Sequence, residues 1–374
     1  MRFHWMLPKG GEVGMKTAQE TSRVLTTKST SKASLPDMEG WVKFSRCAED
    51  AGIESVLMSF SRYEPDTLVI ASALGQATQK LKFIVAYRTG FMQPTTFVQQ
   101  VNTLSGLIDG RVALNIVAGS SAAEQRGYGD FLDHDQRYAR ADEFLGICHK
   151  FWRRNGAVAF KGDYFQVESG QLSTPFTAPD RNAPEIYVSG HSVQAERLAQ
   201  RQGSSWLRLI DTPENLSPLV ERNREHGIEM CLRLCVICRP TREEALDAAR
   251  ALLPDDDTEK QERKILNSSD SQTLKQALAK ADEVGWMNQN LWAGLVPFYG
   301  SSAITLVGAP RELARAFLDY KAIGITQFII SGWPKLEEMV IFGNEVIPLV
   351  RKSEDELVHA KAQSADAKTQ RHPC

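Results

Sequence analysis

The sequence lacks any run of about 18 apolar residues, and it lacks an excess of charge of either sign. Its 374 residues include 44 Lys or Arg and 46 Asp or Glu, which gives a formal net charge of -2. Such a chain is not expected to cross a bilayer, and its charge would not attract nucleic acid or an anionic membrane. The amino-terminal stretch MRFHWMLPKGG lacks the layout of a secretory signal, because Pro8 cuts its apolar part short. These absences predict a cytoplasmic protein without nucleic-acid or membrane partners.

Cysteine is also scarce, since six residues in a chain of this length do not form a disulfide framework. Cys235 and Cys238 have the C-x-x-C spacing of zinc and redox sites. Their segment, CLRLCVIC, has the pattern of a strand, however, in which these two side chains point to opposite faces. No second Cys or His pair lies nearby at ligand spacing. We therefore predict no metal site, and we interpret these cysteines as small buried side chains.

A glycine-rich dinucleotide fingerprint is absent after the first predicted strand, where KGGEVG (9–14) belongs to a long polar loop. An open doubly wound sheet is therefore the less favoured alternative. Short apolar runs instead alternate with helix-period stretches along the chain, which predicts a (β/α)8 TIM barrel with inserted loops. The predicted strands are 2–7, 55–60, 82–87, 111–117, 185–189, 204–209, 230–237 and 326–331. The predicted helices are 37–51, 66–78, 95–107, 136–153, 192–202, 213–226, 241–252 and 310–323.

Three segments interrupt this alternation, at 10–35, 155–184 and 254–303. The second is rich in strand-forming residues, and the third is a candidate lid because long loops near a barrel mouth often close over the site. The polar tail 353–374 is predicted to be disordered. We therefore predict one barrel domain over 1–352 that carries three insertions.

The stretch YVSGHSVQAERLAQRQG (187–203) joins a strand directly to a helix through small polar residues. Free backbone N–H groups and the positive end of the helix dipole meet at such a joint. Because Ser189, Gly190 and Ser192 let an anion approach the backbone, the joint is a candidate phosphate site. The alternative is that Ser192 only caps its own helix.

A second stretch, 114–144, has related features. Ala118 and Gly119 open the loop after a strand, where small side chains would let a flat ring lie close to the barrel mouth. Asn115 offers an amide to the polar edge of such a ring. Tyr138, at the start of the next helix, could donate a hydrogen bond to a phosphate or could simply be a half-buried aromatic residue.

These pieces resemble the bacterial-luciferase-like flavin-dependent monooxygenases, and most of all the alkanesulfonate monooxygenase branch. The resemblance covers nearly the whole chain in the right order. Its most specific part is G-x-P-x-E-x-A followed by Y-x-x-x-G-I-x-x-F-x-x-S-G. The segments that carry it are LKFIVAYR, QPTTFVQQVNTLSGLIDGRVALNIVAGSS, FLDHDQRYARADEF, NLWAG and TLVGAPRELARAFLDYKAIGITQFIISGWPKLEE.

The resemblance implies a barrel with a mobile inserted loop, assembled as a homodimer or homotetramer. It implies reduced FMN (FMNH2) as cofactor, supplied by a separate NAD(P)H-dependent flavin reductase, and O2 as co-substrate. The two would form a peroxyflavin that oxygenates a small-molecule substrate. The residues matched to the FMN phosphate are Tyr138, Ser189, Gly190 and Ser192, and those matched to the flavin ring are Asn115, Ala118 and Gly119.

The substrate end of the site departs from the alkanesulfonate pattern of a Cys, a His, two Arg and a Tyr. Arg233 matches one Arg, whereas the other four positions hold Glu64, Cys235, Tyr299 and Trp333. We predict catalytic roles for three of these residues. Arg233 would bind an anionic group or steady the peroxide, Glu64 would act as a base, and Trp333 would contribute to the site mouth.

The resulting prediction is a two-component FMNH2- and O2-dependent monooxygenase that acts on an organic metabolite. A larger substrate than an alkanesulfonate is expected if five aromatic residues line the mouth: Trp5, Phe91, Phe298, Tyr299 and Trp333. Three alternatives stay open at this point. They are an alkanesulfonate monooxygenase that releases sulfite, a deazaflavin-dependent hydride-transfer enzyme of the same fold, and a flavin-binding protein without turnover.

Overall fold

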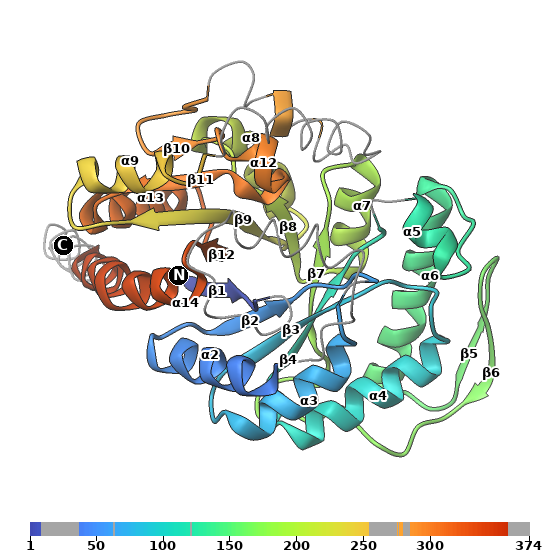
Figure 1. Ribbon diagram of the computed structural model, residues 1–374. Helices are drawn as coiled ribbons and strands as arrows, with labels where there is room; N and C mark the ends of the chain where they lie inside the picture. Colours follow the sequence, from blue (N-terminus) through green and yellow to red (C-terminus); the bar gives the residue numbers. More distant parts are fainter. Residues whose placement is uncertain are drawn as a thin grey trace, which may run out of the picture.

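Eight parallel strands close into a barrel (Figure 1). The computed structural model describes residues 1–8, 37–62, 64–119, 122–253, 275, 277–279 and 285–357. In barrel order the strands are β1 (Arg2–Met6), β2 (Ser55–Met58), β3 (Lys82–Tyr87), β4 (Val112–Ile116), β7 (Glu185–Ser189), β8 (Ser205–Leu209), β9 (Glu229–Cys238) and β12 (Gln327–Gly332). Each strand pairs in parallel with the next, and β12 pairs with β1. The predicted (β/α)8 fold is therefore confirmed, and the open sheet is wrong.

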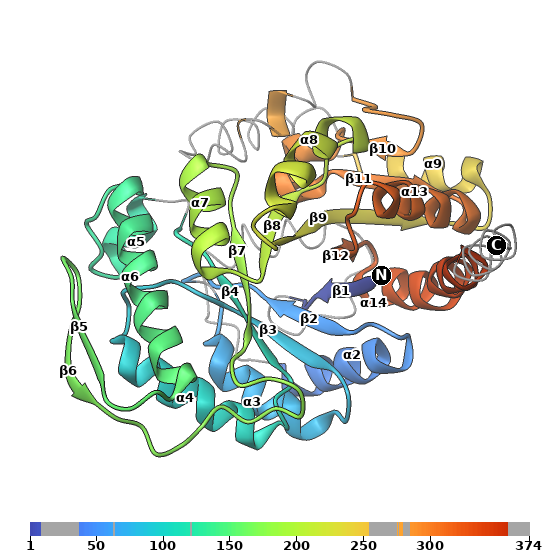
Figure 2. The same cartoon turned by 180° about the vertical axis from the view of Figure 1, so that it is seen from behind.

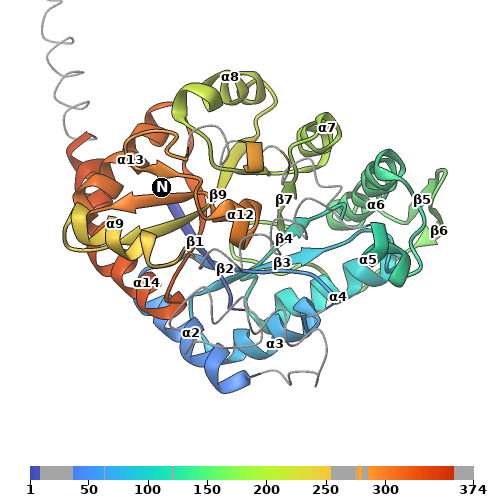
Figure 3. The same cartoon turned by 45° about the horizontal axis from the view of Figure 1, so that its top comes forward.

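Helices surround the strands on the outside, as the tilted view shows (Figure 3). They are α2 (Met38–Asp50), α3 (Thr67–Ala77), α4 (Pro94–Leu107), α5 (Ala122–Gly127), α6 (His134–Arg153), α7 (Val193–Gln202), α8 (Pro213–Arg224), α9 (Arg242–Arg250), α13 (Pro310–Ala322) and α14 (Lys335–Ile341). Local chemistry fixes where several begin. Asp66 caps α3 by accepting from Leu68 N and Val69 N, both at 3.0 Å, which is the capping geometry that stabilises a helix start. No helix in the described ranges is long and apolar enough to span a bilayer.

The two faces of the barrel strands explain their continuous apolar runs, because alternate side chains point outward to the helices and inward to the barrel axis. Outward residues such as Phe83 and Val85 belong to the main core. The inward set is smaller and includes Ile84, Ala86 and Cys231. Small inward side chains near the carboxyl ends of the strands leave room for a cavity at that edge.

Strand β9 is ten residues long and continues beyond the closed barrel. Its first half pairs with β8, whereas Cys235–Cys238 pair with β11 (Thr305–Gly308). Strand β10 (Leu291–Trp292) then adds to β11 in antiparallel orientation. Two short helices lie between them in sequence, α12 (Val296–Tyr299) and η2 (Ser301–Ala303).

Strand β10 and the two short helices, which the sequence did not predict, form the carboxyl-terminal part of the 254–303 insertion, and β11 follows that insertion. Most of the remainder of that insertion, and the whole of 10–35, lie outside the described residues, so the lid stays a prediction. The 155–184 insertion contains an antiparallel hairpin, β5 (Val158–Lys161) and β6 (Gln166–Gly170). The hairpin stands at the edge of the molecule beside α6, far from β9, in both front and back views (Figures 1 and 2). This placement makes the hairpin peripheral to the barrel mouth.

The helix after β12 was not predicted from the sequence. It begins as α14, passes through a π-helical turn at Phe342–Val346 and continues as helix to residue 357. The Glu354 carboxylate accepts from the Met1 amino group at 2.7 Å and from Lys321 Nζ at 2.5 Å. The helix thus continues five residues past the predicted domain end at 352, and residues 358–374 lie outside the described chain.

Candidate active site

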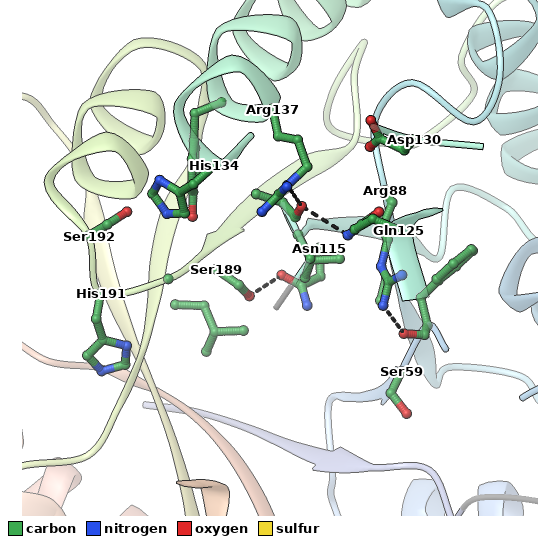
Figure 4. A pocket seen from close by; sticks show the side chains of 18 of the residues that line it. Ser59, Arg88, Asn115, Gln125, Asp130, His134, Arg137, Ser189, His191 and Ser192 are labelled. Atoms are coloured by element: carbon green, nitrogen blue, oxygen red, sulfur yellow. Dashed lines mark hydrogen bonds between the residues drawn. The ribbon is translucent and has the colours of Figure 1, made fainter. Parts of the chain in front are cut away.

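A cavity of about 720 Å³ lies at the carboxyl edge of the barrel, within the size range of small-molecule and cofactor sites. It is lined by residues from the ends of β1 to β4 and β7 to β9, by the loops that follow them, and by Ser301 of η2. The close view shows His191 and Ser192 on one side of this space and Ser59 and Arg88 on the other (Figure 4). The carboxyl edge is where barrel enzymes place their active sites.

The turn Gly190–Ser192 is held against β8 by three hydrogen bonds. Gly190 N donates to Leu207 O at 3.2 Å, Trp206 Nε1 donates to Gly190 O at 2.9 Å, and Leu209 N donates to His191 Nε2 at 3.2 Å. Gly190 has φ +142°, and a Cβ there would lie 2.7 Å from Tyr138 Oη. The position therefore favours glycine, and the bare backbone faces the Tyr138 hydroxyl.

Ser192 is the N-cap of α7, because its Oγ accepts from Ala195 N at 3.2 Å. It is also hydrogen-bonded to Tyr138, whose pKa is raised because its side chain is buried. The first N–H groups of α7 have no acceptor within the helix and lie at the positive end of its dipole. Ser192 therefore caps the helix and also lines the cavity, and its role in phosphate binding stays a prediction.

The loop after β4 forms the adjoining wall. Ser189 Oγ donates to Asn115 Oδ1 at 2.6 Å, which fixes the Asn115 amide (Figure 4). The Ala118 carbonyl accepts from Gln125 Nε2 at 3.2 Å and from Arg137 Nε at 2.9 Å. Gly119, at φ +84°, has no room for a side chain, because a Cβ would meet Gln125.

All seven positions predicted to bind FMN line this one cavity: Asn115, Ala118, Gly119, Tyr138, Ser189, Gly190 and Ser192. They come from three separate stretches of the chain, which the barrel brings together. The floor beneath them is apolar, formed by Met6, Leu57, Ala86 and Leu207. A donor-rich wall above an apolar floor can bind a ligand that combines an anionic group with a flat ring.

Arg233 is the predicted catalytic residue that the structure places in the cavity. Its Nη2 donates to Ser331 Oγ at 2.9 Å, and its Nη1 donates to Ile329 O at 3.3 Å. Burial lowers the pKa of Arg233, and the nearby Cys235 partly offsets this. The Cys235 thiol contacts Ser302 O and Ser331 Oγ, each at 3.1 Å.

Cys238, by contrast, belongs to the outward-facing core. The two members of the C-x-x-C spacing therefore lie on opposite faces of β9, as the strand pattern predicted.

Glu64 does not line the large cavity. It borders a separate space of about 30 Å³ beside Trp41 and Thr67. Ser59 lines both spaces, and its Oγ donates to Glu64 Oε2 at 2.5 Å. Glu64 is therefore connected to the lining of the large cavity through Ser59.

Trp333 is likewise outside the cavity. Its ring packs on Tyr299 with centroids 5.4 Å apart, in a small core formed by α9, β11 and the 285–303 segment. Trp5 is 1% exposed in the main core, with its ring against Phe342. Phe91 and Phe298 do not line the cavity either. The predicted aromatic mouth is therefore wrong, and the larger-substrate inference drawn from it loses its basis.

Besides Arg233, four arginines line the cavity: Arg88, which the sequence also suggested for anion binding, and Arg126, Arg137 and Arg208. Arg88 is 6% exposed, and its Nη2 donates to Glu124 Oε2 at 2.8 Å, which ties α5 to the end of β3. Arg208 lies near the end of β8 and lines the cavity beside Gly190 and Ser192. The sequence signal for Arg208 was a charged residue inside the apolar run SSWLRL. Charged residues are uncommon in buried strands, and near the carboxyl end of a barrel strand they often belong to the site.

A closed barrel with a cofactor-sized cavity at its carboxyl edge is typical of α/β-barrel enzymes. The family model described as luciferase-like monooxygenase matches residues 1–327. The chain belongs to the luciferase-like monooxygenase family, and it is therefore an enzyme of the flavin-dependent monooxygenase class.

Solved structures share this fold. A riboflavin lyase with modified FMN and riboflavin is 17% identical, with a TM-score of 0.71 over 95% of this chain and 92% of that chain. The EDTA monooxygenase of Chelativorans sp. BNC1 is 18% identical, with a TM-score of 0.70 over 95% and 94%. An F420-dependent secondary alcohol dehydrogenase is 20% identical, with a TM-score of 0.61 over 84% and 95%. These similarities establish the fold and do not distinguish the alkanesulfonate branch, which stays a prediction.

Proposed function

We propose that the protein is the oxygenase component of a two-component monooxygenase, which uses reduced FMN and O2 to oxygenate an organic metabolite. The observation that carries the proposal is that a single cavity is lined by all seven positions predicted for FMN together with Arg233. Membership of the luciferase-like family supports the flavin chemistry. A separate NAD(P)H-dependent reductase would supply the reduced flavin.

The residues present fit FMN. Ser192, Tyr138 and the N–H groups that open α7 form the donor set of a phosphate site. Gly190 keeps the backbone open next to the Tyr138 hydroxyl, since a Cβ would lie 2.7 Å from it. We expect the phosphate at this turn and the ring beside Ala118 and Gly119, above the apolar floor. When bound, reduced FMN supplies the two electrons that let O2 deliver one oxygen atom to the substrate and the other to water.

The chain's own side chains define where the substrate would bind. Arg233 is the cationic group on the β9 wall, so it would orient a carboxylate, sulfonate or carbonyl oxygen of the substrate toward the flavin ring. The apolar floor excludes water from the reacting atoms, which protects against unproductive oxidation. The Ser59 hydroxyl, hydrogen-bonded to Glu64, would hold a proton at the opposite wall.

The test is an anaerobic titration of the protein with reduced FMN, followed by rapid mixing with O2 in the presence of candidate compounds. Saturable binding, and an O2-dependent reoxidation whose rate one compound changes, would support the proposal. Incorporation of ¹⁸O from ¹⁸O2 into that compound would identify the reaction as a monooxygenation. Absence of FMN binding would overturn the proposal.

Two alternatives have specific support. The fold is shared with an F420-dependent alcohol dehydrogenase, and tight deazaflavin binding with substrate turnover in the absence of O2 would favour hydride transfer. Arg233 retains one position of the alkanesulfonate pattern, so sulfite release from short alkanesulfonates at ordinary rates would favour desulfonation. Four of the five positions of that pattern differ, which is why we prefer another organic substrate.

The assembly as a homodimer or homotetramer is part of the same proposal. Val69 on α3 and Leu107 at the end of α4 are 66% and 54% exposed. Large apolar side chains in such positions suit a subunit contact. Sedimentation velocity measures the assembly directly, and a monomer at micromolar concentration would contradict this part of the proposal.

A further inference from the structure

Arg208 lies against the turn that we propose as the phosphate site. Its neighbours on β8, Leu207 and Leu209, are both hydrogen-bonded to the Gly190–Ser192 turn, and the Trp206 indole donates to Gly190 O. The backbone of Arg208 is therefore fixed beside this turn. The Arg208 side chain lines the cavity together with Gly190 and Ser192.

The Arg208 guanidinium has no hydrogen-bond acceptor and no ion-pair partner among the residues that the structure describes, and its Nε is buried. The Arg208 Cζ atom lies 4.4 Å from the centroid of the Trp206 ring, so the guanidinium packs against an aromatic face. Burial lowers the pKa of Arg208 to about 10, against the smaller opposing effects of Glu196 and Asp211. The side chain is still a cation at neutral pH.

Glu196, one of the two carboxylates that raise the pKa of Arg208, is already paired with another arginine. Glu196, in the first turn of α7, accepts from Arg222 at 2.6 and 2.8 Å and from Asn223 at 2.8 Å. Within the cavity, Arg137 donates to the carbonyls of Ala118 and Leu132. Among the residues that the structure describes, the turn therefore has hydroxyl and N–H donors next to a partly buried cation that has no hydrogen-bond acceptor. A bound anion would compensate that cation, which is costly to bury alone.

We propose that Arg208 recognises the charge of the cofactor, pairing with its phosphate at the Gly190–Ser192 turn and so selecting FMN over riboflavin. This inference rests on the proposed function, because it assumes that the phosphate binds at this turn. Neutral donors such as Tyr138 and Ser192 can also bind the terminal hydroxyl of riboflavin. The guanidinium favours the doubly charged phosphate, and its planar donors suit two phosphate oxygens.

The test compares the variants R208M and R208K with the unchanged protein. R197M is the matched control, because Arg197 is an exposed residue of α7 outside the cavity and its loss changes the net charge equally. Each protein is titrated anaerobically with reduced FMN and with reduced riboflavin, at low and high salt, by quenching of tryptophan fluorescence. We expect R208M to weaken FMN binding by about ten- to a hundredfold and to leave riboflavin binding within about twofold.

R208K keeps the charge but loses the planar donors, so we expect it to fall between the other two proteins. The salt dependence of FMN binding should decrease in R208M, since a charge–charge contact is screened by salt. R197M should keep the preference for FMN. Circular dichroism and thermal unfolding check that each variant is folded.

The outcomes separate the two proposals. If the unchanged protein binds neither flavin, the proposed function fails. If it prefers FMN and R208M keeps the same preference, only the role of Arg208 is overturned. Equal losses for FMN and riboflavin in R208M would show a structural effect on the whole site and would also overturn it.

Discussion

The two walls of the cavity differ in what builds them. The wall formed by β4, β7 and the start of α7 depends on backbone, with glycines at positive φ, a helix N-terminus and short hydroxyl side chains. The opposite wall, from the ends of β2 and β9 and the 285–303 segment, depends on which long side chains reach the cavity. All seven positions predicted for the first wall line the cavity, whereas only Arg233 of the three predicted for the second does. Cavity-lining positions that depend on backbone conformation are therefore easier to predict from sequence than those that depend on how far a long side chain reaches.

The largest effect is expected from the backbone wall. In the variant Gly190→Val, the added side chain must occupy a backbone at φ +142° and displace Tyr138 and Ala195, whose atoms would lie 2.7 and 2.8 Å from a Cβ. We expect FMN affinity to fall by about a hundredfold or more, measured by anaerobic titration. Affinity within threefold of the unchanged protein would show that the turn does not contact the ligand.

A smaller effect, confined to turnover, is expected at the other wall. Arg233→Met removes the cation that we place against the substrate, so kcat/KM should fall by about ten- to a hundredfold. FMN affinity should stay within about twofold, because the Arg233 side chain is hydrogen-bonded to Ile329 and Ser331 of β12 and not to the turn. If the variant also loses FMN binding, the two walls act as one functional unit and the distinction between them is wrong.

The Tyr138 hydroxyl provides a milder test of the backbone wall. Tyr138→Phe should weaken FMN binding by about five- to tenfold through loss of one hydrogen bond. Because burial raises the pKa of Tyr138, the phenol stays a donor at least to pH 10, and titration of FMN binding below that pH should show no step from this group.

The raised pKa of Tyr138 also determines how this residue affects the free energy of unfolding as pH changes. An unfolded tyrosine ionises near pH 10 and the folded one only above it, so the contribution of Tyr138 is complete below pH 10 and lost as pH rises further. The free energy of unfolding, measured in urea from pH 8 to 11, should fall less steeply in Tyr138→Phe. An identical pH dependence in both proteins would contradict the assignment.

The smallest effect is expected at Trp333, which packs on Tyr299 outside the cavity. Trp333→Phe should change FMN affinity and kcat/KM by less than about threefold. The same assays measure it, with thermal unfolding as the check on folding. A loss of tenfold or more in kcat/KM would mean that the 285–303 segment brings Trp333 to the substrate during turnover.

The barrel and its eight strands could be predicted from the sequence because apolar runs, helix-capping residues and glycines that end helices are local signals. Thr212 and Pro213 show the limit of these signals, because Thr suits an N-cap and Pro suits the first helical position. Pro213 does begin α8, but the Thr212 side chain makes no cap bond, and Asp211 instead accepts from Thr212 N and Asn215 Nδ2. Neighbours compete for such contacts, and only geometry decides which one makes them.

Strands β10 and β11 were missed for a different reason. β10 has only two residues, and both strands are stabilised by pairing with a partner strand rather than by a pattern of their own. Glu64 and Trp333 were assigned to the site by matching positions, but the path of the loops directs them to Ser59 and Tyr299. Loop paths depend on contacts distant in sequence, which a single sequence does not reveal.

The part of β9 that extends beyond the ring of eight strands determines which residues of the chain can change independently of the barrel. Residues 285–308 attach to the part of β9 beyond the ring of eight strands and share a small core of their own with α9, which includes Ile237, Ala245 and Leu295. Changes there need no compensation in the barrel interior, while Ser301 still reaches the cavity. The segment can therefore change in sequence without disturbing the barrel interior, and such a change would reshape the cavity near Ser301 while the proposed FMN site stays the same.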